Sequence, residues 1–156
     1  MVTQAYQNLH ELGVCDRGFV PAFYGYIDRL DPSAFVPPLH HFSRDKFKPR
    51  AILIEYLPDA ERLDCVNYSQ DLIRHAVQGL REIHTAFVHH RDIYPKNMLV
   101  SGGKIIWVDF DVATTFGNMS PIEKAYCEYE IELIESFGKL LDEDQKQGLP
   151  PNTKYY

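Results

Sequence analysis

HRDIYPKNMLVSGGKIIWVDFDVA, residues 90–113, is the stretch that decides the fold. NMLV and IIWV are short apolar runs, and the paired glycines between them supply the positive φ that a tight turn requires. The stretch therefore predicts a β-hairpin. Asp92 and Asn97 lie at its start and Asp109 at its end, so the loops that flank the hairpin can aim all three polar side chains at one point.

A helix is predicted before this stretch, over about residues 68–87. Apolar side chains recur there at i, i+3 and i+4, and charged side chains occupy the other face, which is the pattern of an amphipathic helix packed on a core. The apolar stripe consists of Leu72, Ile73, Ala76, Val77, Leu80, Ile83 and Phe87.

A second long helix is predicted to begin at Ser120. The serine can cap the helix, Pro121 suits the first helical position, and Glu123 can reach back to the amide of the capping residue. We expect this helix to run to about Leu141. Its inward face is predicted to consist of Ala125, Tyr126, Tyr129, Leu133, Phe137 and Leu140.

The first third of the chain is less regular. Tyr6, Leu9 and Leu12 recur at helical spacing, and Gly13 can end that helix. FVPAFYGYI predicts a strand, the proline-rich and charged residues 28–50 predict a long loop, and AILIEYL predicts a buried strand that Pro58 closes. The last nine residues, GLPPNTKYY, lack periodicity and predict a loose tail.

Composition limits the possible functions. A chain of 156 residues with 45% hydrophobic residues fits one folded domain, and its formal net charge of −6 disfavours nucleic acid and anionic membranes as partners. The N-terminus lacks the basic and apolar segments of a secretion signal. Cys15, Cys65 and Cys127 form no CxxC pair. Both observations favour the cytoplasm as the location of the protein, with the nucleus as the alternative. The seven histidines form no HExxH or Cys/His motif, so the sequence predicts no dedicated metal site of that kind.

The polar residues around the hairpin suit phosphoryl transfer, which requires a carboxylate at the acceptor hydroxyl and oxygen ligands for magnesium. HRDIYPKN resembles the catalytic loop of eukaryotic-type protein kinases, and VDFDVA resembles the strand and metal-binding aspartate of their DFG motif, with Asp111 in place of the glycine. ILIEYLPD resembles the strand and hinge of these kinases, and residues 68–87 resemble the helix that leads to their catalytic loop. The resemblance covers roughly residues 19–141. It implies an α+β, protein kinase-like fold, mainly the helical C-terminal lobe with a remnant of the N-terminal lobe sheet.

The resemblance also implies roles for individual residues and two cofactors, ATP and Mg²⁺. Asp92 corresponds to the catalytic base, and Asn97 and Asp109 correspond to the metal ligands. Lys96 lies where tyrosine kinases often carry arginine and would neutralise the transferred phosphoryl group; an ordinary surface lysine is the alternative. The hinge residues, whose backbone would bind adenine, are Glu55, Tyr56 and Leu57.

Two functions follow from the resemblance. The first is a kinase-like phosphotransferase that uses ATP and magnesium to phosphorylate a hydroxyl on a protein or a small molecule. The second is a catalytically impaired or truncated pseudokinase that acts as a binding or scaffold module, because no glycine-rich loop or strand lysine precedes the first helix. In that case a partner would cover the surface that the missing N-lobe strands leave. A third reading makes Asp92 and Asp109 ordinary turn residues.

The expected organisation is one kinase-like domain. Residues 1–57 would form the N-lobe remnant and hinge, residues 58–141 the C-lobe with the catalytic loop, and residues 142–156 the loose tail.

Overall fold

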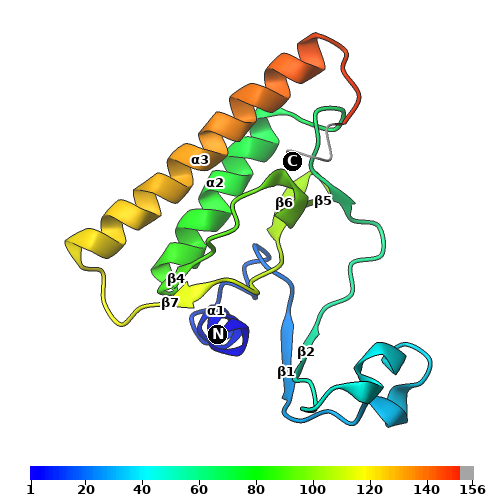
Figure 1. Cartoon of the computed structure of the whole chain (residues 1–156). Coiled ribbons are helices and arrows are strands. Elements are labelled where there is room, and N and C mark those ends of the chain that lie inside the picture. The colour runs from blue at the N-terminus through cyan, green and yellow to red at the C-terminus, as the bar shows by residue number, and fades with distance from the viewer. Residues whose placement is uncertain (152–156) are drawn as a thin grey trace.

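The computed structural model describes residues 1–151, which form an α+β domain with three α-helices and small antiparallel sheets. Two long helices, α2 and α3, lie side by side, and the β5–β6 hairpin packs against α2 (Figure 1). None of the described helices is long and apolar enough to cross a membrane. In chain order the elements are α1 (Val2–Glu11), β1 (Phe23–Ile27), the 3₁₀ helices η1 (Pro32–Phe35) and η2 (His40–Arg44), β2 (Ala51–Ile54), β3 (Glu61–Arg62), α2 (Gln70–Thr85), β4 (Val88–His89), the 3₁₀ helix η3 (Pro95–Asn97), β5 (Met98–Ser101), β6 (Lys104–Trp107), β7 (Thr114–Thr115) and α3 (Pro121–Lys146).

The predicted hairpin is confirmed. Strands β5 and β6 pair antiparallel from Met98↔Trp107 to Ser101↔Lys104, and β3 pairs with the outer edge of β5. Gly102 has φ 56° and Gly103 has φ 75°, so both turn residues occupy the left-handed region that glycine adopts without steric cost.

Helix α2 is confirmed over Gln70–Thr85, and the residues predicted to face inward are buried or half-buried there. Phe87 was wrongly placed in the helix, because it follows the helix end with φ 59°. Ser69 caps it by accepting a hydrogen bond from the backbone N–H of Leu72. The indole Nε1 of Trp107, on β6, donates to the carbonyl oxygen of Ala76 at 3.0 Å. This bond satisfies the one polar group of a fully buried tryptophan and fixes the hairpin against the helix.

Helix α3 begins at the predicted residue, but its buried face is not the predicted one. Its buried positions are Cys127, Glu130, Ile131, Ile134, Gly138 and Leu141. Of the residues predicted to face inward, Leu133 and Phe137 are half-buried, whereas Ala125, Tyr126, Tyr129 and Leu140 are exposed. The prediction was wrong because α3 carries apolar residues on more than one side, so its periodicity alone could not select the packed face.

The capping box of α3 forms only in part. Ser120 accepts from the backbone N–H of Glu123 at 3.3 Å, as predicted, but the Glu123 carboxylate bonds Nε2 of His89 at 2.6 Å.

The helix also continues past Leu141 to Lys146, into the segment predicted to be a loose tail. A side-chain bond from Gln145 to the carbonyl oxygen of Tyr68 holds this last turn. Of the remaining tail, residues 152–156 lie outside the described part of the chain.

The N-terminal third of the chain has two parts. Helix α1 packs against β1, β4 and β7, and its residues Ala5, Tyr6 and Leu9 join the same hydrophobic core as α2 and β6. Leu12, which was predicted to share that face, is exposed. Residues 1–20 therefore belong to the packing of the main body.

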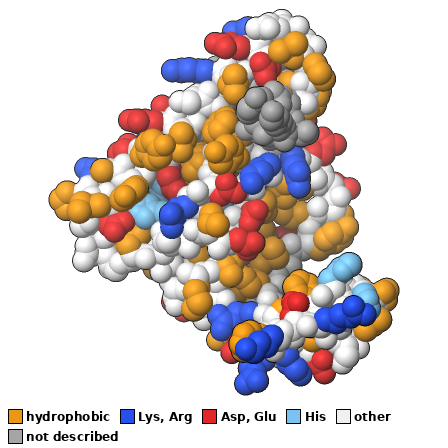
Figure 2. All heavy atoms as spheres, in the orientation of Figure 1, with side chains coloured by type: hydrophobic (Ala, Val, Ile, Leu, Met, Phe, Trp, Pro, Cys, Tyr) orange, Lys and Arg blue, Asp and Glu red, His pale blue; other side chains and the backbone are white. Residues whose placement is uncertain are grey.

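Strands β1 and β2 form a separate two-stranded sheet that leads away from the main body to η1 and η2 (Figure 1). A strand forms at Ala51–Ile54 as predicted, but the prediction that it is buried and reaches residue 57 was wrong, because Leu53 is 41% and Ile54 38% exposed. A sheet of two strands has few neighbours to cover its faces. Figure 2 shows this projecting part at the lower right, where basic and hydrophobic side chains lie side by side.

Candidate functional site

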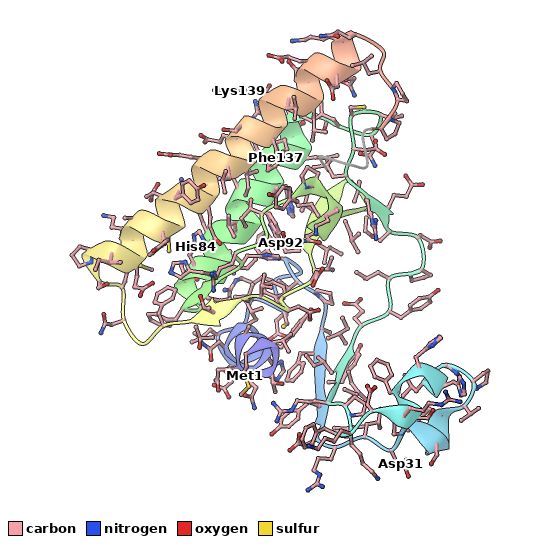
Figure 3. The ribbon with its side chains drawn as sticks, in the orientation of Figure 1. Met1, Asp31, His84, Asp92, Phe137 and Lys139 are labelled. Atoms are coloured by element: carbon pink, nitrogen blue, oxygen red, sulfur yellow. The ribbon has the colours of Figure 1, made fainter. Side chains whose placement is uncertain are left out.

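The core of the candidate site is a pair of side chains in the loop between β4 and β5. Nδ2 of Asn97 donates to the carboxylate Oδ2 of Asp92 at 2.8 Å and to the backbone oxygen of Asp92 at 2.9 Å. Asn97 is only 3% exposed, so its side chain is held in one orientation, whereas the Asp92 carboxylate remains partly accessible. Figure 3 shows Asp92 between the long helices and the hairpin.

The double donation by Asn97 leaves its amide oxygen available. Oδ1 accepts no hydrogen bond from any residue that the structure describes. Carboxylate and amide oxygens are the ligands that Mg²⁺ prefers, so Asn97 presents a suitable atom next to an ionised carboxylate.

Backbone contacts bring the third residue, Asp109, beside this pair. The N–H of Val108 donates to the carbonyl oxygen of Asn97 at 3.0 Å, which joins the end of β6 to the loop. Asp109 follows with φ 64°, a left-handed conformation that aspartate tolerates better than most residues. Its exposed carboxylate makes no hydrogen bond or ion pair within residues 1–151. The structure therefore places Asp92, Asn97 and Asp109 around one junction.

His90 stabilises this junction through hydrogen bonds to the backbone of both of its segments. Its Nε2 donates to the carbonyl oxygen of Val108 at 2.9 Å, and its Nδ1 accepts from the backbone N–H of Asp92 at 3.3 Å. The ring is fully buried against Trp107 and Phe110. Burial lowers the pKa of His90, so the ring stays neutral and both nitrogens keep these roles at neutral pH.

Lys96 lies beside Asp92. Its Nζ is 3.1 Å from Oδ2 of Asp92, and both side chains are partly exposed. Burial raises the pKa of Asp92, but the hydrogen bonds from Asn97 and Lys96 outweigh this effect, and the net pKa is lower than usual. The aspartate is therefore ionised at neutral pH.

Glu130 on α3 is an unpredicted part of the site. Its Oε1 accepts from the backbone N–H of Arg91 at 2.6 Å, and its Oε2 accepts from the backbone N–H of His90 at 3.3 Å and from Nε2 of His84 at 2.7 Å. Arg91 has φ 66°, and these bonds help to hold the strained turn before Asp92. Burial raises the pKa of Glu130, but the hydrogen bonds from His84 and Arg91 lower it by more.

Sequence patterns did not reveal Glu130 because a buried glutamate on a helix looks like a surface residue. The conformation of the loop thus depends on a carboxylate that lies 39 positions after Arg91 and 40 after His90 in the chain. The Arg91 side chain itself is exposed and makes no ion pair among the described residues.

The three residues predicted as the hinge lie at the end of β2. The backbone N–H of Glu55 donates to the carbonyl oxygen of Ala22 at 2.8 Å, and the Glu55 carboxylate accepts from the N–H of Ala22 at 3.1 Å. Tyr56 is 84% exposed and Leu57 is half-buried. Within the described residues, no hydrogen bond or ion pair joins the three to the loop that holds Asp92.

A cavity of about 520 Å³ lies on the other side of that loop, toward α3. Asp92, Asn97 and Asp109 are not among its lining residues. Hydrophobic side chains gather along α3 on the face drawn in Figure 2. The cavity is lined by His89, Arg91, Ile93, Tyr94, Thr114, Glu123, Tyr126, Tyr129, Glu130, Leu133 and Phe137.

No family model matches the sequence, and no curated protein shows significant similarity to it.

Proposed function

We propose that this chain is a kinase-like phosphotransferase that uses ATP and magnesium to phosphorylate a hydroxyl group on a protein or a small molecule. The observation that carries the proposal is the junction of Asp92, Asn97 and Asp109. It combines an ionised carboxylate with an amide oxygen and a second carboxylate that, within residues 1–151, accept no hydrogen bond. This donor set suits a magnesium nucleotide and the hydroxyl that attacks it.

Each residue has a distinct part in the proposal. Asp92, oriented by Asn97, would accept the hydrogen bond and then the proton of the acceptor hydroxyl. Oδ1 of Asn97 and the carboxylate of Asp109 would hold the metal. Lys96, which now pairs with Asp92, would turn toward the charge of the phosphoryl group. The magnesium nucleotide, when bound, supplies the phosphoryl group and neutralises much of its charge.

A second candidate is a kinase-like binding or scaffold module without turnover. Two observations favour it: the hinge residues Glu55, Tyr56 and Leu57 lie apart from the loop contacts, and the cavity described above does not include Asp92. In such a module the hydrogen bonds between Asp92 and Asn97 would serve only to shape the loop.

Thermal stability in the presence of nucleotide tests the proposed magnesium nucleotide site. A ligand that binds only the folded state stabilises it by RT ln(1 + [L]/Kd), so millimolar ATP with magnesium should raise the melting temperature of the wild-type chain. ATP with a chelator should not. The Asp109→Asn variant should lose the shift while its unliganded melting temperature stays equal or rises, because a carboxylate near other carboxylates is repulsive without metal.

Asp111→Asn is the matched control, since Asp111 is an exposed carboxylate near Asp109 that the proposal leaves out of the metal site. The shift should persist in this variant. An assay of ADP release distinguishes the phosphotransferase from the binding module. Only the phosphotransferase should release ADP in response to an added alcohol or peptide. Folded wild-type protein with no response to ATP and magnesium would rule out the phosphotransferase.

A further inference from the structure

Two histidines and a cysteine meet where α2, β4 and α3 converge, near the loop that holds Asp92. One ring nitrogen of His84, one of His89 and Sγ of Cys127 lie within 4.8 Å of one another, and all three residues are buried. They come from the last turn of α2, the end of β4 and the first turns of α3. Figure 3 labels His84 at the end of α2.

We propose that His84, His89 and Cys127 bind one zinc ion. Imidazole nitrogen and thiolate sulfur are the ligands that zinc selects, whereas magnesium and calcium require oxygen. This site is therefore chemically distinct from the oxygen site proposed at Asn97 and Asp109, and it does not depend on the proposed function.

The spacing of the ligand atoms is close to that of a zinc site. Sγ of Cys127 is 3.8 Å from Nδ1 of His89. Zinc bonds of about 2.3 Å to sulfur and about 2.0 Å to nitrogen, at a tetrahedral angle, put the sulfur and a nitrogen about 3.5 Å apart. Because all ligand atoms lie within 4.8 Å of one another, the cluster needs at most about 1.5 Å of closure, which side-chain rotation can supply.

The surroundings of both histidines are those of metal ligands. Nε2 of His89 donates to Glu123 at 2.6 Å, and Nε2 of His84 donates to Glu130 at 2.7 Å. A carboxylate on one ring nitrogen fixes the tautomer. Nδ1 of His89, the atom that faces Cys127, therefore keeps a free electron pair, which is the usual arrangement around histidine–zinc bonds. Phe116 stacks on the His89 ring, with the ring centroids 4.4 Å apart, and holds its orientation.

The ion has a path to the site. His89, Glu123 and Glu130 also line the 520 Å³ cavity, and the Glu123 side chain is partly exposed to solvent. Binding displaces the Cys127 thiol proton to solvent, and a water molecule from the cavity completes the fourth tetrahedral position.

The zinc ion would join three elements that the His84–Glu130 and His89–Glu123 hydrogen bonds already link. Glu130 contacts both this cluster and the backbone of the loop before Asp92, so the ion would stiffen the support of that loop. Zinc is therefore expected to raise the melting temperature of the chain, since it binds the folded arrangement.

Cobalt titration of untagged, chelator-treated protein tests the proposal. The wild-type chain should bind one cobalt ion with the near-ultraviolet thiolate charge-transfer band, and one equivalent of zinc should remove the band. Cys127→Ser should lose the band, and Cys65→Ser, another buried free cysteine, should keep it. Glu123→Gln should keep the band but weaken zinc binding by roughly tenfold.

Circular dichroism establishes that each variant is folded before titration. Asp109→Asn should bind zinc like the wild type, which separates this site from the proposed magnesium site. The titration of the wild-type protein can refute the proposal by itself. Folded wild-type protein without a charge-transfer band would overturn it. A band of equal strength in Cys127→Ser would also overturn it.

Discussion

Replacement of Glu130 by glutamine measures how strongly α3 holds the loop before Asp92. The substitution preserves shape but replaces one carboxylate oxygen by an NH₂ group. Two strong bonds converge on this carboxylate, from His84 at 2.7 Å and from the backbone of Arg91 at 2.6 Å, together with a weaker one from His90 at 3.3 Å. Glutamine offers a single acceptor atom and no charge, so at least one of the donors loses its acceptor and the remaining bonds lose the charge.

The expected cost follows from these contacts. A hydrogen bond to a charged group contributes about 1.5–3 kcal/mol, and a buried donor left without an acceptor costs about 1–3 kcal/mol. Because Glu130 is only 5% exposed, solvent cannot replace the lost partner. We expect Glu130→Gln to lower the free energy of unfolding by about 2–4 kcal/mol, a large share of the roughly 5–15 kcal/mol that stabilises an ordinary domain.

Urea unfolding followed by the fluorescence of Trp107 measures this difference. Trp107 is the only tryptophan and is fully buried, so its emission reports on the core next to the loop. Glu128→Gln is the control: the same change on an exposed side chain of α3, whose 3.9 Å ion pair with Arg81 is at the surface. The control should cost under about 0.5 kcal/mol. Equal stabilities of Glu130→Gln and Glu128→Gln would refute the role assigned to Glu130.

The remaining predictions concern pH and packing. Because the pKa of Glu130 is lowered in the folded state from 4.5, its contribution is complete above pH 4.5 and is lost as the pH falls further, so the stability gap between wild type and Glu130→Gln should narrow in acid. His90 has a folded pKa below 6.5, so the unfolded chain binds the proton first and wild-type stability should fall as the pH drops below 6.5; constant stability down to pH 5, measured by urea unfolding, would contradict this. Gly79→Ala should destabilise by about 1 kcal/mol in thermal melts, because its methyl group would lie 3.1 Å from the Trp107 ring and the strain exceeds the gain in helix propensity. Ser120→Ala should cost about 1 kcal/mol by loss of the α3 cap, and restoration by Ser120→Asp would confirm the cause.

Local chemistry explains which parts of the fold were predictable. The hairpin followed from apolar runs around paired glycines, α2 from a single apolar stripe, and the start of α3 from Ser120 and Pro121. In each case, residues that are neighbours in sequence determine the conformation. The candidate site was predictable to the same extent, because Asp92, Lys96 and Asn97 lie on one short loop and the hairpin returns the chain to Asp109.

The predictions failed where packing partners are distant in sequence. Helix α3 turns Gly138 toward α2, where an added Cβ would lie 3.1 Å from Ile73. This close approach, together with the bonds of Glu130, selects the buried face and leaves Tyr126 and Tyr129 at the cavity. A search for apolar periodicity cannot identify a buried glutamate. Glu130 is buried because it accepts hydrogen bonds from backbone N–H groups that are distant in sequence.

The sequence alone determined the hairpin, the long helices and the polar loop at Asp92, since turns, caps and single apolar stripes act between near neighbours. Only the tertiary structure decided which face of α3 is packed and that β1 and β2 form a sheet of their own that leads to η1 and η2. It also decided that His84, His89 and Cys127 meet, and that Glu130 supports the loop. These contacts join residues that are far apart in the chain, and their energies arise only when the elements dock.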